Sequence, residues 1–309
     1  MQRLLATGGD LALLGLTLAA LATVAGRSFW MLDLASHFQH YYAWAAGLLL
    51  ILNLVLRRRR AALVSVALLG LAVFHLLPYY LPRSEVAEAG VPYKAMLLNL
   101  NLHNQKTSAV RAEIAANDPD ILVLQEVTPR WREELKALPA GFKHSLDLPE
   151  RGAFGIWILS KFELQDQDVQ RRDGIAFLLI KYQVAGRTLT VVALHPLPPV
   201  GAAASRTRNT ILADAAVSAA GEGSRIAIGD FNCSPWSPYF RNFLKVSGLR
   251  DSALGRGVHG TWMSGLLSGI PIDHVLVSPD IEVLDRQVGN DVGSDHRAVV
   301  VKFQFSQQP

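Results

Sequence analysis

Three apolar runs, each close to 20 residues long, occupy most of the first 82 residues of the chain. They cover residues 8–26, 38–56 and 61–82. A helix needs about 20 apolar residues to cross the hydrocarbon core of a bilayer. A cleaved signal peptide is the alternative interpretation of the first run, but two further runs follow it. The sequence therefore predicts a membrane anchor over residues 1–83 with three transmembrane helices.

An arginine cluster separates the second run from the third, at residues 57–60. Short loops rich in Lys and Arg stay on the cytoplasmic side of a membrane. We therefore expect the amino terminus and this cluster inside the cell, and the 27–37 loop outside. The small and polar segment 84–93 is expected to be a linker, and everything that follows it is expected outside.

The remainder of the chain carries little net charge. Residues 1–90 hold seven of the 30 Lys and Arg residues and four of the 26 acidic residues, which leaves 23 basic and 22 acidic residues for 91–309. This balance lacks the basic excess that is typical of a dedicated duplex-DNA binder. Cys233 is the single cysteine, which rules out an intrachain disulfide.

Strand patterns outnumber helix patterns from residue 94 onward. The strand that begins there carries Asn99 and Asn101 on one face and leucines on the other. Further strands are predicted over 120–127, 154–160, 174–184, 188–196, 225–232, 271–278 and 297–305, and helices over 108–117, 131–138, 207–220 and 237–248. Because several strands follow one another without a helix between them, a layered α/β sandwich is favoured over a doubly wound parallel sheet.

Polar residues gather where these apolar strands begin or end. They are Asn101, Glu126, His195, Asp230, Asn232, Asp273, Asp295 and His296. Asp and Asn are common turn residues, so one such position alone would mean little. So many of them, with carboxylates beside amides and imidazoles, predict a site at one rim of the sandwich.

Six segments in this part resemble the motifs of the endonuclease/exonuclease/phosphatase superfamily, and they occur in its order. They are LLNLNLHN, DILVLQEV, LHPLPP, GDFNCSP, PIDHVLVS and GSDHRAVV. The resemblance implies a four-layer α-β-β-α sandwich as the catalytic domain over residues 94–309. The three membrane runs before it are similar to those of a membrane-anchored bacterial subgroup. This implies a multi-pass protein of the cytoplasmic (inner) membrane, with its catalytic domain on the extracytoplasmic side.

The resemblance also assigns roles to the rim residues. It implies metal ligands at Asn101, Glu126 and Asp295, catalytic residues at His195, Asp230, Asn232, Asp273 and His296, and substrate contacts from Arg206 and Asn232. Asn99 is a rival for Asn101 on the same strand face, and the role of His274 stays open. Hard oxygen ligands suit Mg²⁺, with Mn²⁺ as an alternative ion.

These roles predict a divalent-metal-dependent phosphoric ester hydrolase that cleaves phosphodiesters. The substrate is expected to be either nucleic acid, as for a nuclease, or a phospholipid or its head group. No protein partner is predicted. The alternative hypothesis is a non-catalytic membrane-anchored module that retains the fold.

Overall fold

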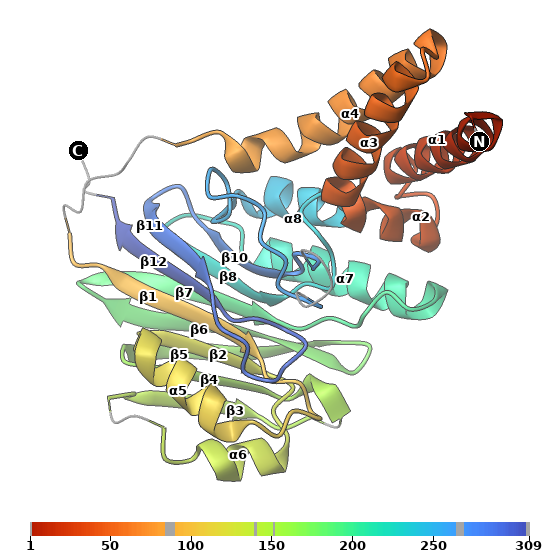
Figure 1. The fold of residues 1–309 in the computed structure, drawn as a ribbon. Helices are drawn as coiled ribbons and strands as arrows, with labels where there is room; N and C mark the ends of the chain where they lie inside the picture. Colours follow the sequence, from red (N-terminus) through yellow and green to blue (C-terminus); the bar gives the residue numbers. More distant parts are fainter. Residues whose placement is uncertain (1, 84–89, 139–140, 151, 264–268, 307–309) are drawn as a thin grey trace.

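The structure, a computed structural model, describes residues 2–83, 90–138, 141–150, 152–263 and 269–306. Its amino-terminal part consists of three long apolar helices that project from a sandwich of two sheets (Figure 1). The elements of this part are α1 (Gln2–Val24), α2 (Trp30–Leu34), η1 (Ala35–Phe38), α3 (Gln39–Val55) and α4 (Arg59–Tyr80). Three spans are long and apolar enough to cross a membrane, namely Arg3–Val24, Trp30–Val55 and Arg59–Tyr80. The prediction of three such helices is therefore confirmed, whereas the expected 27–37 loop is mostly helical.

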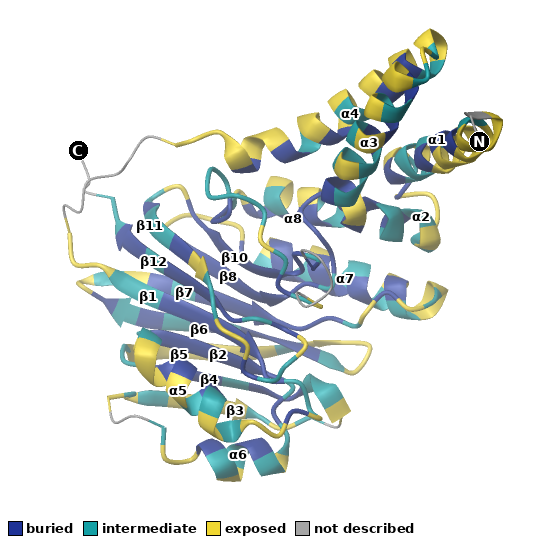
Figure 2. Cartoon of the chain, viewed as in Figure 1, coloured by how far each residue is buried: buried dark blue, intermediate teal, exposed yellow. Residues whose placement is uncertain are grey.

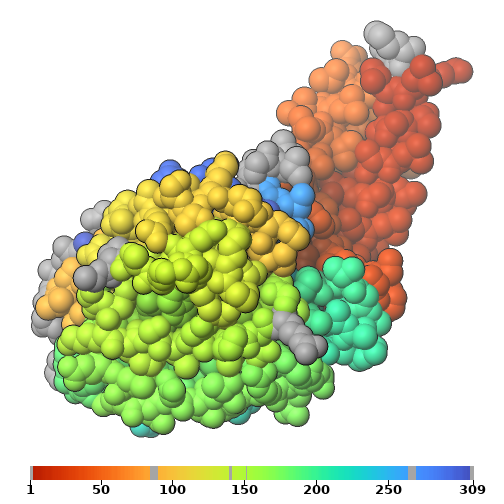
Figure 3. Space-filling model, turned by 90° about the horizontal axis from the view of Figure 1, so that it is seen from below, coloured from red at the N-terminus to blue at the C-terminus, as the bar shows by residue number. Residues whose placement is uncertain are grey.

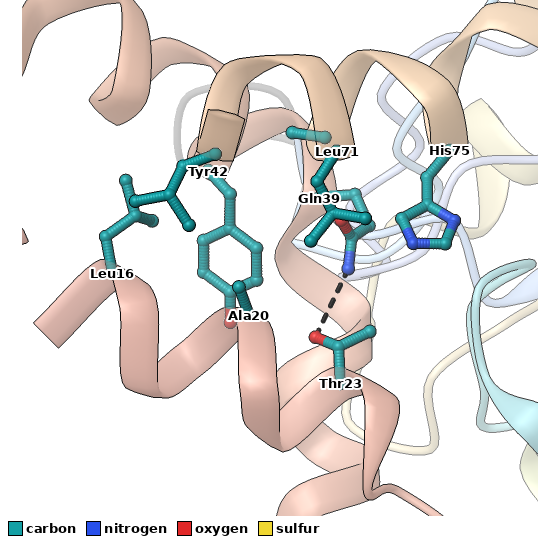
Figure 4. Close-up of a pocket in the computed structure, with 9 residues that line it drawn as sticks. Leu16, Ala20, Thr23, Gln39, Tyr42, Leu71 and His75 are labelled. Carbon is teal, nitrogen blue, oxygen red and sulfur yellow. Dashed lines mark hydrogen bonds between the residues drawn. The ribbon is translucent and has the colours of Figure 1, made fainter. Parts of the chain in front are cut away.

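Many residues on the projecting helices are exposed (Figure 2), and several of them are large and apolar. Leu11, Leu48 and Phe74 are each about 70% exposed. Large exposed apolar surfaces of this kind mark contact with a membrane or with another protein. Inside the bundle the three helices enclose a small cavity, where Gln39 Nε2 of α3 donates to Thr23 Oγ1 of α1 over 3.3 Å (Figure 4). This hydrogen bond joins α1 to α3 inside the bundle.

Two six-stranded sheets form the remaining part of the molecule. The first has the order β11-β12-β1-β2-β4-β3 and the second the order β5-β6-β7-β8-β10-β9. The first contains β1 (Tyr93–Asn99), β2 (Ile121–Gln125), β3 (His144–Leu148), β4 (Ile156–Ser160), β11 (Ile281–Val288) and β12 (Val299–Phe305). The second contains β5 (Glu163–Arg172), β6 (Ile175–Val184), β7 (Arg187–Leu194), β8 (Ser224–Asp230), β9 (Arg250–Asp251) and β10 (Asp273–Val277).

The helices of this part cover the outer faces of the two sheets (Figure 1). They are α5 (Thr107–Asn117), α6 (Pro129–Leu135), α7 (Ala202–Ser218) and α8 (Pro238–Ser247), with the short turn η2 (Gly152–Phe154) beside the first sheet. Two of the strand pairs, β1 with β2 and β7 with β8, are parallel. Parallel neighbours need a crossover connection, which α5 and α7 provide.

The alternation of side chains along the strands produces the layers. On β1, Ala95 and Leu97 point into the core between the sheets, whereas Met96 and Leu98 pack in the cluster that contains α5 and α6 residues. On β8, Ile226 and Ile228 face the same central core, and Ala227 lies among residues of α7 and α8. The predicted four-layer α-β-β-α sandwich is confirmed.

Candidate active site

The inner faces of the two sheets end at a cleft of about 600 Å³. Side chains alternate along a strand, so Asp230 follows Ile226 and Ile228 on the inner face of β8. Asp273 shares the inner face of β10 with Val275. The described lining residues are Trp30, Leu34, His37, Glu126, Ala153, Phe154, His195, Pro198, Pro199, Val200, Asp230, Asn232, Trp262, Ile270, Ile272, Asp295 and His296. Six of the predicted site residues, from four strand ends, therefore meet in one cleft.

The carboxylate of Asp230 lies between two imidazoles. Its Oδ2 atom is 3.6 Å from His195 Nε2 and 3.8 Å from His296 Nε2, and all three side chains are almost fully buried. The other oxygen, Oδ1, accepts a hydrogen bond of 2.8 Å from the backbone N–H of Asn232. Burial alone would raise the pKa of Asp230, but His195, His296 and the Asn232 N–H more than offset it and lower that pKa. Asp230 is therefore an ionised carboxylate at neutral pH.

His296 is held by a second carboxylate. Its Nδ1 atom lies 2.8 Å from Asp273 Oδ2, and Asp273 is itself buried. Burial alone would lower the pKa of His296, but the charge and hydrogen bond of Asp273, with Asp230 and Asp295 nearby, raise it from 6.5 to about 10. The ring is thus an imidazolium at neutral pH, able to bind an anion or to donate a proton.

Hard oxygen donors lie along another part of the same cleft. Glu126 accepts hydrogen bonds from Asn99 Nδ2 (3.1 Å) and from the backbone N–H of Leu102 (3.0 Å). Asn101 Nδ2 donates to Asp295 Oδ1 over 2.6 Å. Each carboxylate keeps lone pairs free of these bonds. Glu126 and Asp295, with an amide oxygen beside them, match the ligands that Mg²⁺ prefers.

Both candidate amides lie beside this oxygen set. Asn99 is buried and is bonded directly to Glu126, whereas Asn101 is half-buried and is bonded to Asp295. Each amide oxygen accepts one backbone N–H, from Asn101 in the case of Asn99 and from His103 in the case of Asn101, and keeps a second lone pair. The choice between the two amides therefore stays open.

Asp230, Asp273 and His296 form a second group whose donor atoms lie within 4.8 Å of one another. Within this group, His296 Nδ1 already bonds to Asp273 Oδ2. An imidazolium has no free nitrogen lone pair for a metal. The Glu126–Asp295 set therefore fits a divalent cation better than this group does.

Arg206 and His274 lie away from the cleft. Arg206 is exposed on α7 and is not among the described residues that line the cleft. His274 points to the outer face of β10, where its ring packs 4.4 Å from that of Phe240 and its Nε2 lies 2.9 Å from the Cys233 carbonyl oxygen. His274 therefore packs in the core beneath α8, which the alternation from Asp273 could have indicated.

Arg208, two residues after Arg206, is the arginine that supports the site. It is fully buried, and its Nη1 atom donates to the carbonyl oxygen of Asn232 over 3.0 Å. Its Nη2 atom is 2.5 Å from Oδ2 of Asp33, a buried residue of α2. Ser237 Oγ donates to the other Asp33 oxygen over 2.8 Å. A residue of the amino-terminal helical part thus holds the arginine that bonds to the Asn232 backbone, and α7 lies beside that part (Figure 3).

Two further residues at the cleft were not predicted as site residues. Gln125 donates from Nε2 to the Leu194 carbonyl oxygen (2.8 Å) and accepts from the Asp230 N–H through Oε1 (3.0 Å). This amide joins the two sheets directly behind the cleft. Trp262 Nε1 donates to Asp295 Oδ2 over 2.9 Å and so orients that carboxylate. In the sequence, the adjacent residues Gln125 and Glu126 at the end of a predicted strand could have indicated Gln125 as a site residue.

We expect the metal-free protein to lose stability between pH 7 and pH 10. The pKa of His296 is raised in the folded protein, so its stabilising contribution is complete below pH 6.5 and is lost as the pH rises through about 10. Thermal unfolding midpoints in EDTA should fall more steeply over this range in the parent protein than in His296→Gln. Equal slopes for the two proteins would contradict the assignment of the imidazolium.

Comparisons with known proteins bear on the family and the fold of the sandwich. A family model described as "Endonuclease/Exonuclease/phosphatase family" matches residues 96–296, which is more than half of the chain. No curated protein matches the chain. An endonuclease/exonuclease/phosphatase from Beutenbergia cavernae has 22% sequence identity and a TM-score of 0.55, with 70% of this chain and 72% of that chain covered.

Two structures that contain DNA also share the fold. D. rerio TDP2 complexed with single-strand DNA product has 16% identity and a TM-score of 0.58, and the match covers 70% of this chain and 100% of that chain. The 3′ phosphatase NExo from Neisseria, bound to a product DNA hairpin, has 21% identity and a TM-score of 0.55, with 69% and 100% covered. The sandwich of this chain therefore has the same fold as these solved structures.

Proposed function

Because the chain belongs to the endonuclease/exonuclease/phosphatase family, we propose that it is a membrane-anchored, divalent-metal-dependent hydrolase of phosphodiesters. The observation that carries the proposal is the position of Asp230 between His195 and His296, in the cleft that also contains Glu126 and Asp295. Enzymes of this family use divalent metals and hydrolyse phosphoesters.

The residues divide the work of hydrolysis as follows. Asp230 accepts a proton from the attacking water, whose oxygen bonds to phosphorus as the bond from phosphorus to the leaving oxygen breaks. The His296 imidazolium gives its proton to the leaving oxygen, while Asp273 holds the ring. Asn232 and His195 donate hydrogen bonds to the non-bridging phosphate oxygens.

The metal would be held by Glu126, Asp295 and one of the amides of Asn99 and Asn101. A Mg²⁺ ion bound there neutralises phosphate oxygens and stabilises the charge that develops in the displacement. Mn²⁺ prefers similar oxygen ligands and is the alternative ion.

We further propose that α1, α3 and α4 cross the bacterial cytoplasmic membrane. Their exposed apolar surfaces and the cluster Arg57–Arg60 support this proposal. The cluster would lie on the cytoplasmic side, and the sandwich on the opposite side. The boundaries of anchor, linker and catalytic domain remain 1–83, 84–93 and 94–309 in this proposal.

A nuclease is the second candidate, because D. rerio TDP2 and Neisseria NExo were solved with DNA products. The charge of this chain argues against it. None of the described residues that line the cleft is Lys or Arg. A strand of nucleic acid needs basic side chains to neutralise its phosphates.

The proposed function is tested with the purified full-length chain in detergent and bis(p-nitrophenyl) phosphate as substrate. We expect no turnover in EDTA and restored turnover on addition of Mg²⁺. Glu126→Gln should raise the Mg²⁺ concentration for half-maximal rate by roughly 10- to 100-fold, because it removes a charged ligand. Glu163→Gln, on the exposed strand β5, is the matched control and should behave as the parent protein.

Two other results would contradict parts of this proposal. Absence of turnover with Mg²⁺ and with Mn²⁺, on diesters and on monoesters, would leave the non-catalytic anchored module as the better hypothesis. If Glu126→Gln left the Mg²⁺ concentration for half-maximal rate unchanged, the metal would have to bind in another part of the cleft.

A further inference from the structure

We propose that the substrate is a lipid-like phosphoester of the bilayer, and that the membrane anchor itself forms the wall against which its apolar chain binds. The inference rests on the proposed function and names the substrate class of the same site. It assigns Trp30 and Leu34 of α2 as specificity-determining residues. In the reaction, water adds to phosphorus and the alcohol of the head group or of the lipid leaves with a proton.

The composition of the cleft wall is the first observation. Apart from its catalytic groups, the described lining is almost entirely apolar, with Phe154, Pro198, Val200 and Ile270 among its members. Trp30 and Leu34 complete this lining from the anchor. Transfer of apolar chain from water to such a surface is favourable by about 25 cal/mol per Å². A small, fully polar phosphoester would leave this wall unused.

The wall is a fixed part of the site. The α2–η1 segment is tied to the sandwich by buried polar contacts on both sides of Leu34. Asp33 pairs with Arg208 at 2.5 Å, and His37 Nδ1 accepts the backbone N–H of Ser234 over 3.1 Å. The segment that carries Trp30 and Leu34 is therefore held against the sandwich in one orientation.

The position of α2 between two apolar helices places this wall at the membrane surface. α2 and η1 join the end of α1 to the start of α3, where the chain leaves and re-enters the proposed membrane. Phe29 and Met31 are about half exposed, and Val200 of the cleft rim is 80% exposed. Apolar side chains exposed at this level would lie among lipid head groups and acyl chains. A lipid could thus enter the cleft without passing through water.

The charge of the cleft favours a substrate with one phosphate group over a substrate with many. His296 and the proposed metal site provide positive charge at a single point, and the described lining contains no Lys or Arg. A nucleic-acid strand would bring further phosphates that this lining could not neutralise. An amphiphile with one phosphoester satisfies both the polar and the apolar parts of the cleft.

The test uses the full-length chain in detergent with a series of p-nitrophenyl alkyl phosphates. The methyl, butyl and octyl esters share one leaving group and are used as monomers in solution. Burial of a methylene corresponds to about fourfold in binding, so kcat/KM should rise at least tenfold from methyl to octyl. Trp30→Ser should remove most of this preference, whereas Trp30→Phe, which keeps an apolar wall, should retain it.

Trp44→Ser is the matched control. Trp44 is also a tryptophan of the anchor, but it lies half exposed on α3 and does not line the cleft. This variant should keep the full chain-length preference. A second arm reconstitutes the chain in phosphatidylcholine vesicles and measures release of water-soluble head group, which is expected for the parent and reduced at least fivefold in Trp30→Ser.

Each other outcome overturns the inference. Turnover of the methyl ester without chain-length preference would refute the lipid-like substrate and leave the proposed function intact. An equal loss of kcat/KM on all esters, in both Trp30→Ser and Trp30→Phe, would show that Trp30 has a structural role and does not determine specificity. Nicking of plasmid DNA faster than octyl ester turnover would favour the nuclease. No turnover of any ester would refute the proposed function, and the inference with it.

Discussion

Replacement of Asp230 by asparagine is expected to lower kcat/KM for a phosphodiester by roughly 10³-fold. General base assistance contributes about 10²–10⁴-fold, and an amide cannot accept the proton of water at neutral pH. The change also removes the anion that lies 3.6 Å from His195 and 3.8 Å from His296. The pKa of His296 should therefore fall, and the alkaline limb of any residual rate should move to lower pH. Steady-state rates between pH 6 and pH 10 measure both effects.

A matched variant separates this result from a general loss of carboxylate charge. Asp166→Asn changes an exposed aspartate of β5 that pairs with Lys181 far from the cleft. Its kcat/KM should equal that of the parent protein. If Asp230→Asn also kept its rate within about threefold, the role of Asp230 as base would be refuted.

The buried pair between Asp33 and Arg208 is expected to produce the largest change in stability. Both side chains are fully buried, and removal of one partner leaves an uncompensated charge, which typically costs about 3–5 kcal/mol. Asp33→Asn and Arg208→Met should each lower the thermal unfolding midpoint strongly, and the double variant should lose less than the sum of the two. Calorimetry in detergent gives the coupling between the residues.

An exposed ion pair that also involves α7 serves as the control. Arg172 and Asp214 are 2.6 Å apart on the surface. Exposed pairs contribute little because water screens them, so Arg172→Met and Asp214→Asn should leave the midpoint nearly unchanged. Additive effects of Asp33→Asn and Arg208→Met would show that the two side chains do not stabilise each other.

The sequence predicted the sandwich because its central strands are strongly apolar. The strand over 225–232 corresponds to β8, and the strand over 120–127 corresponds to β2. Two of the missed strands, β5 and β11, lack such a pattern. β5 is exposed along nearly its whole length and carries mostly polar side chains, and β11 alternates too weakly to stand out. Their pairing with β6 and β12 supplies the regular structure that local pattern does not show.

The residues of the candidate site could be predicted from the strand ends. The residues that hold them in place could not. Asp230 follows inward-facing apolar residues by strict alternation and Asp273 precedes them, so their convergence could be predicted. The pairing of Asp33 with Arg208 joins positions 175 residues apart, and no local pattern indicates it. Trp30 and Leu34 belong to a segment that composition assigns to a loop beside the membrane. Their place in the cleft depends on how the amino-terminal helices pack against the sandwich.

The attachment of α2 to the sandwich has a kinetic consequence. For a protein anchored as proposed, the catalytic groups stay at one height above the bilayer, since Asp33 and His37 tie the segment between two spans to α7 and to the Cys233–Ser237 turn. Encounter with substrate then occurs by lateral diffusion in two dimensions. Turnover should follow the mole fraction of substrate in the leaflet, so that dilution with inert lipid slows the reaction even when the bulk concentration is constant.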